Sequence, residues 1–304
     1  MSPRAGGTSL CGYAAIAGVP NVGKSTLLNA LVGMKLSIIS PKPQTTRRNV
    51  IGVLSTDDYQ AVLVDTPGLL DPAYRLHEVM QQHARNAIQG SDVLLLMIDA
   101  SGLVDRDPEP DMKAALEAAG ERTPVVLALN KVDRTPKPKL LPLMDRCRDF
   151  HDFRAMVPIS ALKSEGIDDL LQEVVRCLPE GPRLYPDEMI TDQPERFFIS
   201  ELVREVVFHR FGQEVPYATM TRVDEMEERG REEKDYIRVN IFVERPSQKG
   251  ILLGKGGRAI REVGTRARKE IEEFLGRPVY LELWVKVKED WRREEARLKE
   301  LDLL

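Results

Sequence analysis

Two hydrophobic patterns follow one another along the chain. From about residue 10 to 178, short apolar runs alternate with amphipathic helical stretches, and the runs read YAAIAGV, QAVLVDT, VLLLMIDA, PVVLALN and AMVPIS. Runs of this length favour buried strands, and their alternation with helices predicts an α/β fold, a mostly parallel sheet with helices on both faces. Such a sheet has loops at the carboxyl ends of its strands that can carry a ligand.

Prolines interrupt this pattern at positions 179, 182, 186 and 194. Because this density breaks both helices and strands, we interpret residues 181–195 as a linker or an extended arm. Beyond it the pattern predicts an α+β domain in the order αββααβ. The predicted elements are a helix at 196–212, strands at 217–226 and 235–245, a short helix before a glycine loop at 254–257, a helix at 259–275 and a strand at 279–287.

The composition agrees with two soluble domains. A chain of 304 residues exceeds what one core needs, and it has 42% hydrophobic and 30% charged residues. No apolar run approaches membrane-spanning length, so we expect a cytoplasmic protein. Three cysteines, Cys11, Cys147 and Cys177, lack metal-type spacing, so we expect idle or buried thiols. The net charge of −4 argues against a protein that coats nucleic acid, but Arg245–Arg297 carries 14 basic against 9 acidic residues, which favours a local polyanion contact.

The stretch GVPNVGKST at 18–26 fits the phosphate-binding pattern G-x-x-x-x-G-K-[ST] between a predicted strand and a predicted helix. Gly18 and Gly23 permit the tight turn, backbone N–H groups can wrap the β-phosphate, Lys24 can neutralise the β- and γ-phosphates, and the Ser25 hydroxyl can bind Mg²⁺. The alternative is an ordinary glycine-rich turn. The residues expected to contact a nucleotide here are Gly18, Val19, Pro20, Asn21, Val22, Gly23, Lys24, Ser25 and Thr26.

Three further motifs follow predicted strands. In DTPG at 65–68, Asp65 can reach Mg²⁺ through water and the Gly68 N–H can meet the γ-phosphate. In NKVD at 130–133, the Asp133 carboxylate can accept hydrogen bonds from guanine N1–H and N2–H₂, which adenine does not offer. A backbone N–H of ISA at 159–161 can recognise guanine O6. In this order the motifs predict a site for GTP and GDP, whose other expected contacts are Thr66, Pro67, Asn130, Lys131, Ser160 and Ala161.

The order and spacing of these motifs resemble the translation-factor-like GTPases, and PQTTRR at 43–48 matches their effector loop. The resemblance implies that Thr46 supplies a second hydroxyl to Mg²⁺, with Thr45 as the alternative. The expected metal ligands are therefore Ser25, Thr46 and Asp65, and the residues expected to act in catalysis are Lys24, Thr46 and Gly68.

One position departs from many small GTPases. Leu69 stands where they place a glutamine after the DxxG motif, and a leucine cannot orient the attacking water. Catalysis must then come from Mg²⁺, Lys24 and backbone donors. Asn21 occupies the position that coordinates K⁺ in related GTPases with a hydrophobic residue there, so we hypothesise activation by K⁺. The alternative is that Asn21 only stabilises the loop.

The second glycine loop, GKGG at 254–257, lacks the hydroxyl residue and the glycine spacing of a nucleotide loop. In an αββααβ frame it fits the G-x-x-G loop of a KH RNA-binding domain, with a helix-loop-helix turn as the alternative. We expect the RNA contacts to be Ile251, Gly254, Lys255, Gly256, Gly257, Arg258 and Arg261, with bases lying against Ile251 and Ile260. Trp284 and Trp291 could stack on bases, although the pattern equally allows Trp284 in the core.

A GTPase domain followed by a KH domain that contains GKGG resembles the bacterial Era family over residues 10 to 292. We expect a flexible tail at 1–9, a GTPase domain at 10–180, a linker at 181–195, a KH domain at 196–292 and a charged C-terminal helix or tail at 293–304. The resemblance implies a GTP-hydrolysing switch, with GTP or GDP and Mg²⁺ as cofactors, that binds single-stranded RNA at the 3′ end of 16S rRNA and acts in assembly of the 30S subunit. We expect a monomer, with K⁺ as the hypothesised activator.

The sequence is also compatible with two other functions. One is a regulatory GTPase at the membrane whose KH domain binds a protein partner, since members of the family associate peripherally with the inner membrane. The other is an RNA-stimulated NTPase that remodels RNA. We expect no DNA partner, and we expect GTP to change the packing against the KH domain.

Overall fold

The computed structural model describes residues 9–230 and 233–304, so the expected flexible tail lies, apart from Ser9, outside the described residues. The chain forms two compact units. The first comprises the chain up to Ser37, Thr46–Ala73 and His77–Asp192, and the second comprises Ile38–Thr45, Tyr74–Leu76 and Gln193–Leu304. Most of the expected linker therefore belongs to the first unit, and a short piece of the expected effector loop belongs to the second.

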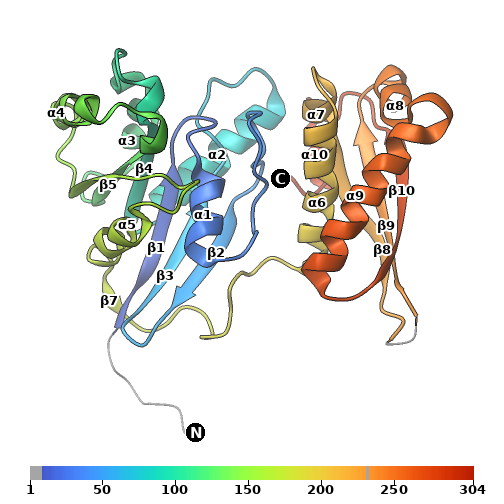
Figure 1. The fold of residues 1–304 in the computed structure, drawn as a ribbon, viewed down its shortest axis with the longest axis horizontal. Helices are drawn as coiled ribbons and strands as arrows, with labels where there is room; N and C mark the ends of the chain where they lie inside the picture. The colour runs from blue at the N-terminus through green and yellow to red at the C-terminus, as the bar shows by residue number, and fades with distance from the viewer. Residues whose placement is uncertain (1–8, 231–232) are drawn as a thin grey trace, which may run out of the picture. The chain divides into compact units, whose positions relative to one another are not determined.

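The first unit contains the mostly parallel sheet that the sequence predicts (Figure 1). Its strands, in spatial order, are β2 (Val50–Ser55), β3 (Tyr59–Asp65), β1 (Ser9–Ala17), β4 (Val93–Asp99), β5 (Val125–Asn130) and β6 (Ala155–Pro158), with the short β7 (Glu180–Gly181) beside β1. Strand β2 pairs antiparallel with β3, and β7 pairs antiparallel with β1, whereas the other neighbours are parallel. The sequence pattern did not predict β2.

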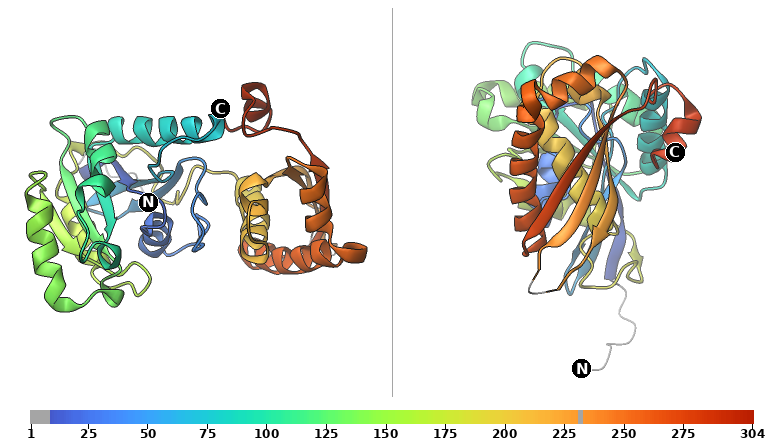
Figure 2. Two further views of the ribbon diagram at one scale, coloured as in Figure 1. Left: turned by 90° about the horizontal axis from the view of Figure 1, so that it is seen from above. Right: turned by 90° about the vertical axis from the view of Figure 1, so that its right-hand side faces the viewer.

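Helices cover both faces of this sheet, as Figure 2 shows. They are α1 (Lys24–Val32), α2 (Arg75–Gln89), α3 (Glu109–Ala118), α4 (Leu140–Arg148) and α5 (Ile167–Val175). Helices α1 and α5 contact each other and the sheet, while residues of α2, α3 and α4 share one hydrophobic cluster with residues of β1, β4 and β5. Because β1, β3, β5 and β6 run in the same direction, their carboxyl ends carry all four predicted motifs at one edge of the sheet.

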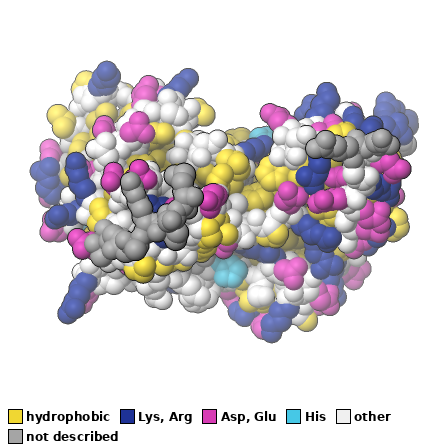
Figure 3. All heavy atoms as spheres, turned by 90° about the horizontal axis from the view of Figure 1, so that it is seen from below, with side chains coloured by type: hydrophobic (Ala, Val, Ile, Leu, Met, Phe, Trp, Pro, Cys, Tyr) yellow, Lys and Arg dark blue, Asp and Glu magenta, His cyan; other side chains and the backbone are white. Residues whose placement is uncertain are grey.

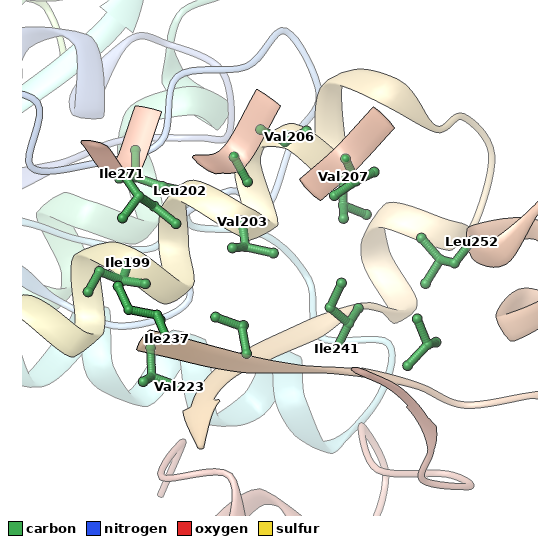
Figure 4. Packing of buried hydrophobic residues seen from close by; sticks show 14 of the residues in the cluster. Ile199, Leu202, Val203, Val206, Val207, Val223, Ile237, Ile241, Leu252 and Ile271 are labelled. Carbon is green, nitrogen blue, oxygen red and sulfur yellow. The ribbon is translucent and has the colours of Figure 1, made fainter. Parts of the chain in front are cut away.

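The second unit has the predicted αββααβ order. Its elements are α6 (Glu195–Arg210), α7 (Val215–Ala218), β8 (Met220–Glu227), β9 (Asp235–Val243), α8 (Pro246–Leu253), α9 (Arg258–Leu275), β10 (Val279–Val287) and α10 (Glu295–Glu300). The sheet order is β10-β9-β8, with β10 parallel and β8 antiparallel to β9. Figure 4 shows Val203 of α6 and Ile271 of α9 in one core with Ile237 and Ile241 of β9.

The C-terminal segment is part of this second unit. Trp291 is fully buried and donates from its indole nitrogen to the Ala218 carbonyl at 2.9 Å, so it does not offer a ring for stacking. Leu298 of α10 is also fully buried. Trp284, by contrast, is 46% exposed on β10. Within the described chain, no helix combines the length and the hydropathy that crossing a membrane requires.

Candidate nucleotide site and nucleic-acid interface

The P-loop joins the end of β1 at Ala17 to the start of α1 at Lys24. Gly18 has φ 149°, and a Cβ there would lie 2.3 Å from the Met97 carbonyl oxygen. Gly23 has φ 107°, and a Cβ there would lie 2.3 Å from Asn130 Nδ2. Both glycines of the motif are therefore required by the backbone conformation and by the neighbouring strands.

Lys24 is folded back over the loop. Its Nζ donates to the carbonyls of Gly18 and Val19, at 3.0 Å each. Burial lowers the pKa of Lys24 to about 8, and the nearby Asp65 carboxylate opposes this shift. Because anionic charge favours the protonated amine, phosphate groups within the loop would hold Lys24 in its charged form.

Three side chains expected to bind a metal meet beside the P-loop. Ser25 Oγ lies 2.9 Å from Thr46 Oγ1 and 2.8 Å from Asp65 Oδ2, and Thr46 Oγ1 lies 3.3 Å from the same carboxylate oxygen. Burial raises the pKa of Asp65, against the effect of Lys24 and of hydrogen bonds that include those from Ser25 and Thr46. Its second oxygen, Oδ1, is buried and makes no hydrogen bond of ordinary geometry in the described part of the chain. This set of oxygen donors fits Mg²⁺.

The metal would need further ligands from the nucleotide. No three His, Cys, Asp or Glu side chains among the described residues are grouped to hold a metal ion. Two hydroxyls and one carboxylate match a cation that is completed by phosphate oxygens and water. When bound, Mg²⁺ would neutralise charge that develops on the β- and γ-phosphates. Thr46 reaches this cluster, whereas the Thr45 carbonyl accepts from Arg204 Nη2.

The DTPG loop is attached to the P-loop and to α2. The Leu69 N–H donates to the Gly18 carbonyl at 3.1 Å, and a Cβ on Gly68 would lie 2.8 Å from Pro20 Cα. Gln81 of α2 donates from Nε2 to the Gly68 carbonyl at 3.1 Å. Its Oε1 accepts from the Leu70 N–H at 3.4 Å. These contacts fix the backbone that carries the Gly68 N–H.

The Leu69 side chain points into the core. It is 4% exposed and belongs to the same hydrophobic cluster as Ala84 and Ile88 of α2. It therefore contributes nothing polar to a water molecule that attacks the γ-phosphate. Lys24, backbone N–H groups and a bound metal remain as groups that can stabilise the transition state of hydrolysis.

The base-binding motifs lie at the ends of β5 and β6. Asn130 Nδ2 donates to the Val22 carbonyl at 2.6 Å, and Asn130 Oδ1 accepts from the Ala161 N–H at 2.9 Å. Asn130 thus connects the P-loop to the ISA segment. Ser160 Oγ donates to Asp133 Oδ1 at 2.7 Å, which orients the carboxylate expected to read guanine.

Replacing Asp133 with asparagine is expected to weaken GTP binding by about a hundredfold or more, because the amide cannot accept both guanine hydrogen bonds. Xanthosine triphosphate, which has an acceptor in place of the 2-amino group, should regain affinity. Titration of both nucleotides by calorimetry measures the change. A variant that prefers GTP as strongly as the wild-type protein would contradict this role for Asp133.

The GKGG loop of the second unit joins α8 to α9. Gly254, Gly256 and Gly257 have φ of 68°, 61° and 73°, the region that favours glycine. A Cβ on Gly254 would lie 2.7 Å from Ala259 Cβ, whereas at Gly256 and Gly257 it would meet nothing within 4 Å. The loop is therefore open to an approaching backbone. Helix α9 begins at Arg258 without a side-chain cap; the Arg258 N–H donates to the Lys255 carbonyl, and the positive end of the helix dipole faces the loop and favours a phosphate there.

A groove of about 590 Å³ runs between α9 and β10. Its lining residues include the apolar Ile260, Gly264 and Leu283, the basic Arg261 and Arg268 and the acidic Glu282. A second hollow on α9 is lined by Arg258, Arg261 and Arg266 among others. On the face drawn in Figure 3, basic and acidic side chains are interspersed. Basic residues beside an apolar groove suit a polyanion with flat, unpaired bases.

The structure brings most predicted RNA-binding residues to this groove or to its glycine loop. Gly257 and Arg261 line the groove, and Gly254, Lys255, Gly256 and Arg258 lie in or next to the loop. Ile260 also lines it. Ile251 does not: it lies on α8, is 48% exposed and is not among the lining residues.

Sequence reasoning missed two residues of the nucleotide site. Asp99, at the end of β4, binds Lys131 Nζ at 2.6 Å. Burial would raise the Asp99 pKa, but hydrogen bonds from Lys131 and Ser101 outweigh it and lower the pKa. The sequence contained a signal for Asp99, because it ends a predicted strand. That strand, β4, lies beside β5, which ends at Asn130. The second residue is Gln81, for which the helical pattern of α2 gives no signal.

Comparison with known proteins gives two family matches. Residues 13–131 match the family described as 50S ribosome-binding GTPase. Residues 214–292 match the KH domain family.

Two solved structures are similar over nearly the whole chain. One is Aquifex aeolicus Era, in a variant form, bound to GDP.AlF4⁻; it has 40% sequence identity and a TM-score of 0.91, and the match covers 96% of this chain and 99% of that chain. The other is Era in complex with MgGDPNP and nucleotides 1506–1542 of 16S ribosomal RNA, with 40% identity, a TM-score of 0.91, and coverage of 97% and 99%.

Proposed function

The chain belongs to the Era family of GTPases, and from this premise we propose that its KH domain binds single-stranded RNA at the 3′ end of 16S rRNA and that the protein acts in 30S subunit assembly and 16S rRNA maturation. The observation that carries the proposal is the groove between α9 and β10, which begins at the GKGG loop and combines an apolar lining with arginines. An Era structure of 40% identity contains nucleotides of 16S rRNA. We propose the small subunit because that structure contains 16S rRNA, although the description of the matching GTPase family names the 50S subunit.

We also propose that the bound nucleotide biases RNA binding through the effector loop. The segment Ile38–Thr45 belongs to the second compact unit, and Thr46 belongs to the first. Within the second unit, Arg204 of α6 donates to the Thr45 carbonyl, and Lys42 Nζ donates to the Phe208 carbonyl. Thr46 directly follows the segment Ile38–Thr45, which is hydrogen-bonded to α6. Ordering of Thr46 by Mg²⁺ and the γ-phosphate would therefore restrain that segment and, through it, α6.

Crosslinking the protein to cellular RNA and sequencing the crosslinked sites tests the RNA target. Sites concentrated at the 3′ end of 16S rRNA would support the proposal, as would depletion that reduces mature 30S subunits and raises unprocessed 16S rRNA. Crosslinks spread over many RNAs, with turnover that scales with duplex substrate, would favour an RNA-remodelling NTPase. Absence of RNA crosslinks together with a captured protein would favour the regulatory GTPase.

Localisation and assembly state follow from the same premise. We propose a monomer in the cytoplasm that also associates peripherally with the membrane, as family members do, and that does not use DNA as a partner. Fractionation of cells with and without high-salt washing tests the membrane part, because a peripheral contact through charge is released by salt.

GTP hydrolysis is expected to be about tenfold faster in K⁺ than in Na⁺ at equal ionic strength, because the proposed site would hold K⁺ in preference to the smaller Na⁺ and the bound cation would add charge stabilisation that Leu69 cannot provide. Asn21, which has φ 65° in the P-loop, is the proposed ligand. Asn21→Ala should remove the difference between the two salts while GDP still binds. Equal rates in K⁺ and Na⁺ for the wild-type protein would reject K⁺ activation.

A further inference from the structure

We propose that Gly264 forms a base-binding recess in the RNA groove: its missing side chain leaves the space in which one unpaired base lies against Leu283. The proposal deepens the RNA-binding function and rests on it. Gly264 lies in the interior of α9, an 18-residue helix. A glycine in a helix interior destabilises the helix relative to alanine, so its presence needs an explanation.

Backbone conformation does not explain it. Gly264 is absent from the described glycines with positive φ, so it has an ordinary helical conformation that alanine adopts readily. Gly254 shows the contrast, because there φ is 68° and an added Cβ would lie 2.7 Å from Ala259 Cβ.

Packing of the helix on the sheet does not explain it either. A Cβ on Gly264 would meet one atom within 4 Å, Leu283 Cδ1, at 3.5 Å. That is an ordinary van der Waals contact, which alanine would make without displacing β10. The fold therefore has room for a methyl group at this position and would gain helix stability from it.

The groove supplies the explanation. Gly264 shares one face of α9 with Ile260, one turn before it, and Arg268, one turn after it, and all three line the groove. At Gly264 the helix wall has no side chain, so the floor consists of helix backbone and Leu283. An apolar recess of this kind fits the face of a nucleobase, and Arg261 and Arg268 beside it suit the phosphates on either side.

The chain offers a matched control in Gly250. It lies in α8, has no positive φ, meets nothing within 4 Å of an added Cβ, and is not among the residues that line the groove. Gly250→Ala should therefore raise helix stability as Gly264→Ala does, without changing the space available to a base.

The test uses the full chain and a labelled RNA with the sequence of 16S rRNA nucleotides 1506–1542, at one salt concentration. Gly264→Ala should raise the unfolding midpoint by roughly 3 °C and weaken RNA binding by about tenfold, and Gly264→Leu should weaken it by about a hundredfold, the range that stacking of one base spans. Gly250→Ala should raise the midpoint and leave RNA affinity unchanged. Wild-type affinity in both Gly264 variants would overturn the proposal.

Abasic substitution along the RNA identifies the base. At one position, removal of the base should weaken binding to the wild-type protein and have little further effect on Gly264→Leu, because that variant has already lost the contact. If every abasic position affected both proteins equally, no base would lie at Gly264. A wild-type protein that does not bind this RNA would instead overturn the proposed function itself. The alanine variant keeps the test valid if the leucine variant proves misfolded by circular dichroism.

Discussion

Gly68→Ala is expected to slow GTP hydrolysis by about a hundredfold, because it displaces the N–H group expected to meet the γ-phosphate. An added Cβ would lie 2.8 Å from Pro20 Cα and 2.9 Å from Pro20 N, and both atoms belong to the P-loop backbone. Real Cβ atoms do not approach this closely, so the DTPG loop must move away from the P-loop. The 3.1 Å hydrogen bond from the Leu69 N–H to the Gly18 carbonyl would be lost with it.

Single-turnover hydrolysis measures this effect, and titrations with GDP and with a non-hydrolysable GTP analogue separate binding from chemistry. GDP lacks the γ-phosphate, so its affinity should be nearly unchanged, whereas the analogue should bind more weakly. Gly181→Ala serves as a control, since Gly181 pairs with Ser9 at the start of β1, away from the P-loop, and an added Cβ there meets nothing within 4 Å. A Gly68→Ala protein that hydrolyses GTP at the wild-type rate would show that this loop can shift without loss.

The double change Lys255→Asp and Gly256→Asp is expected to reduce RNA affinity by more than about a hundredfold and to leave intrinsic GTP hydrolysis unchanged. Both residues are exposed in the GKGG loop, and Gly256 has φ 61° with nothing within 4 Å of an added Cβ. Aspartate is among the residues that tolerate this conformation, so the loop should keep its fold. The loss then comes from repulsion between two carboxylates and the RNA phosphates.

Fluorescence anisotropy with labelled RNA at several salt concentrations measures this loss, and the salt dependence should become shallower because a phosphate contact is removed. A control with the same change in charge is Lys113→Asp with Gly120→Asp, at exposed positions of the first unit. Unchanged RNA affinity in the GKGG variant would place the RNA site elsewhere, whereas equal weakening by the control would point to net charge alone.

Motifs whose spacing is dictated by the nucleotide were the most predictable part of the protein. The P-loop, DTPG, NKVD and ISA each follow a strand, and the sheet order places all four at one edge. Strand β2 was missed because VIGVLS is short, follows a polar loop and is interrupted by Gly52. That glycine is explained only by the structure, where an added Cβ would lie 2.7 Å from Val32 Cγ2.

Side-chain pairs formed across the fold could not be predicted. The Arg204 guanidinium reaches the Thr45 carbonyl 159 positions away, and Lys131 reaches Asp99 across 32 positions. Neither pair leaves a periodic signal, because each depends on how separate elements pack. The same limit applied to Trp291. Its indole N–H can be buried because the Ala218 carbonyl of α7 accepts a hydrogen bond from it, and this partner is distant in the sequence.

The buried Leu69 has a consequence for timing. Because the Leu69 side chain offers no polar group to the attacking water, we expect the site to keep GTP intact for long periods unless a cation or a partner accelerates cleavage. Under the proposed function, a long-lived GTP-bound state would time the binding of the protein to RNA, and GTP turnover itself would not be the purpose of the enzyme. The interval that it measures would be the dwell time on the RNA, and any factor that completes the catalytic site would set the moment of departure.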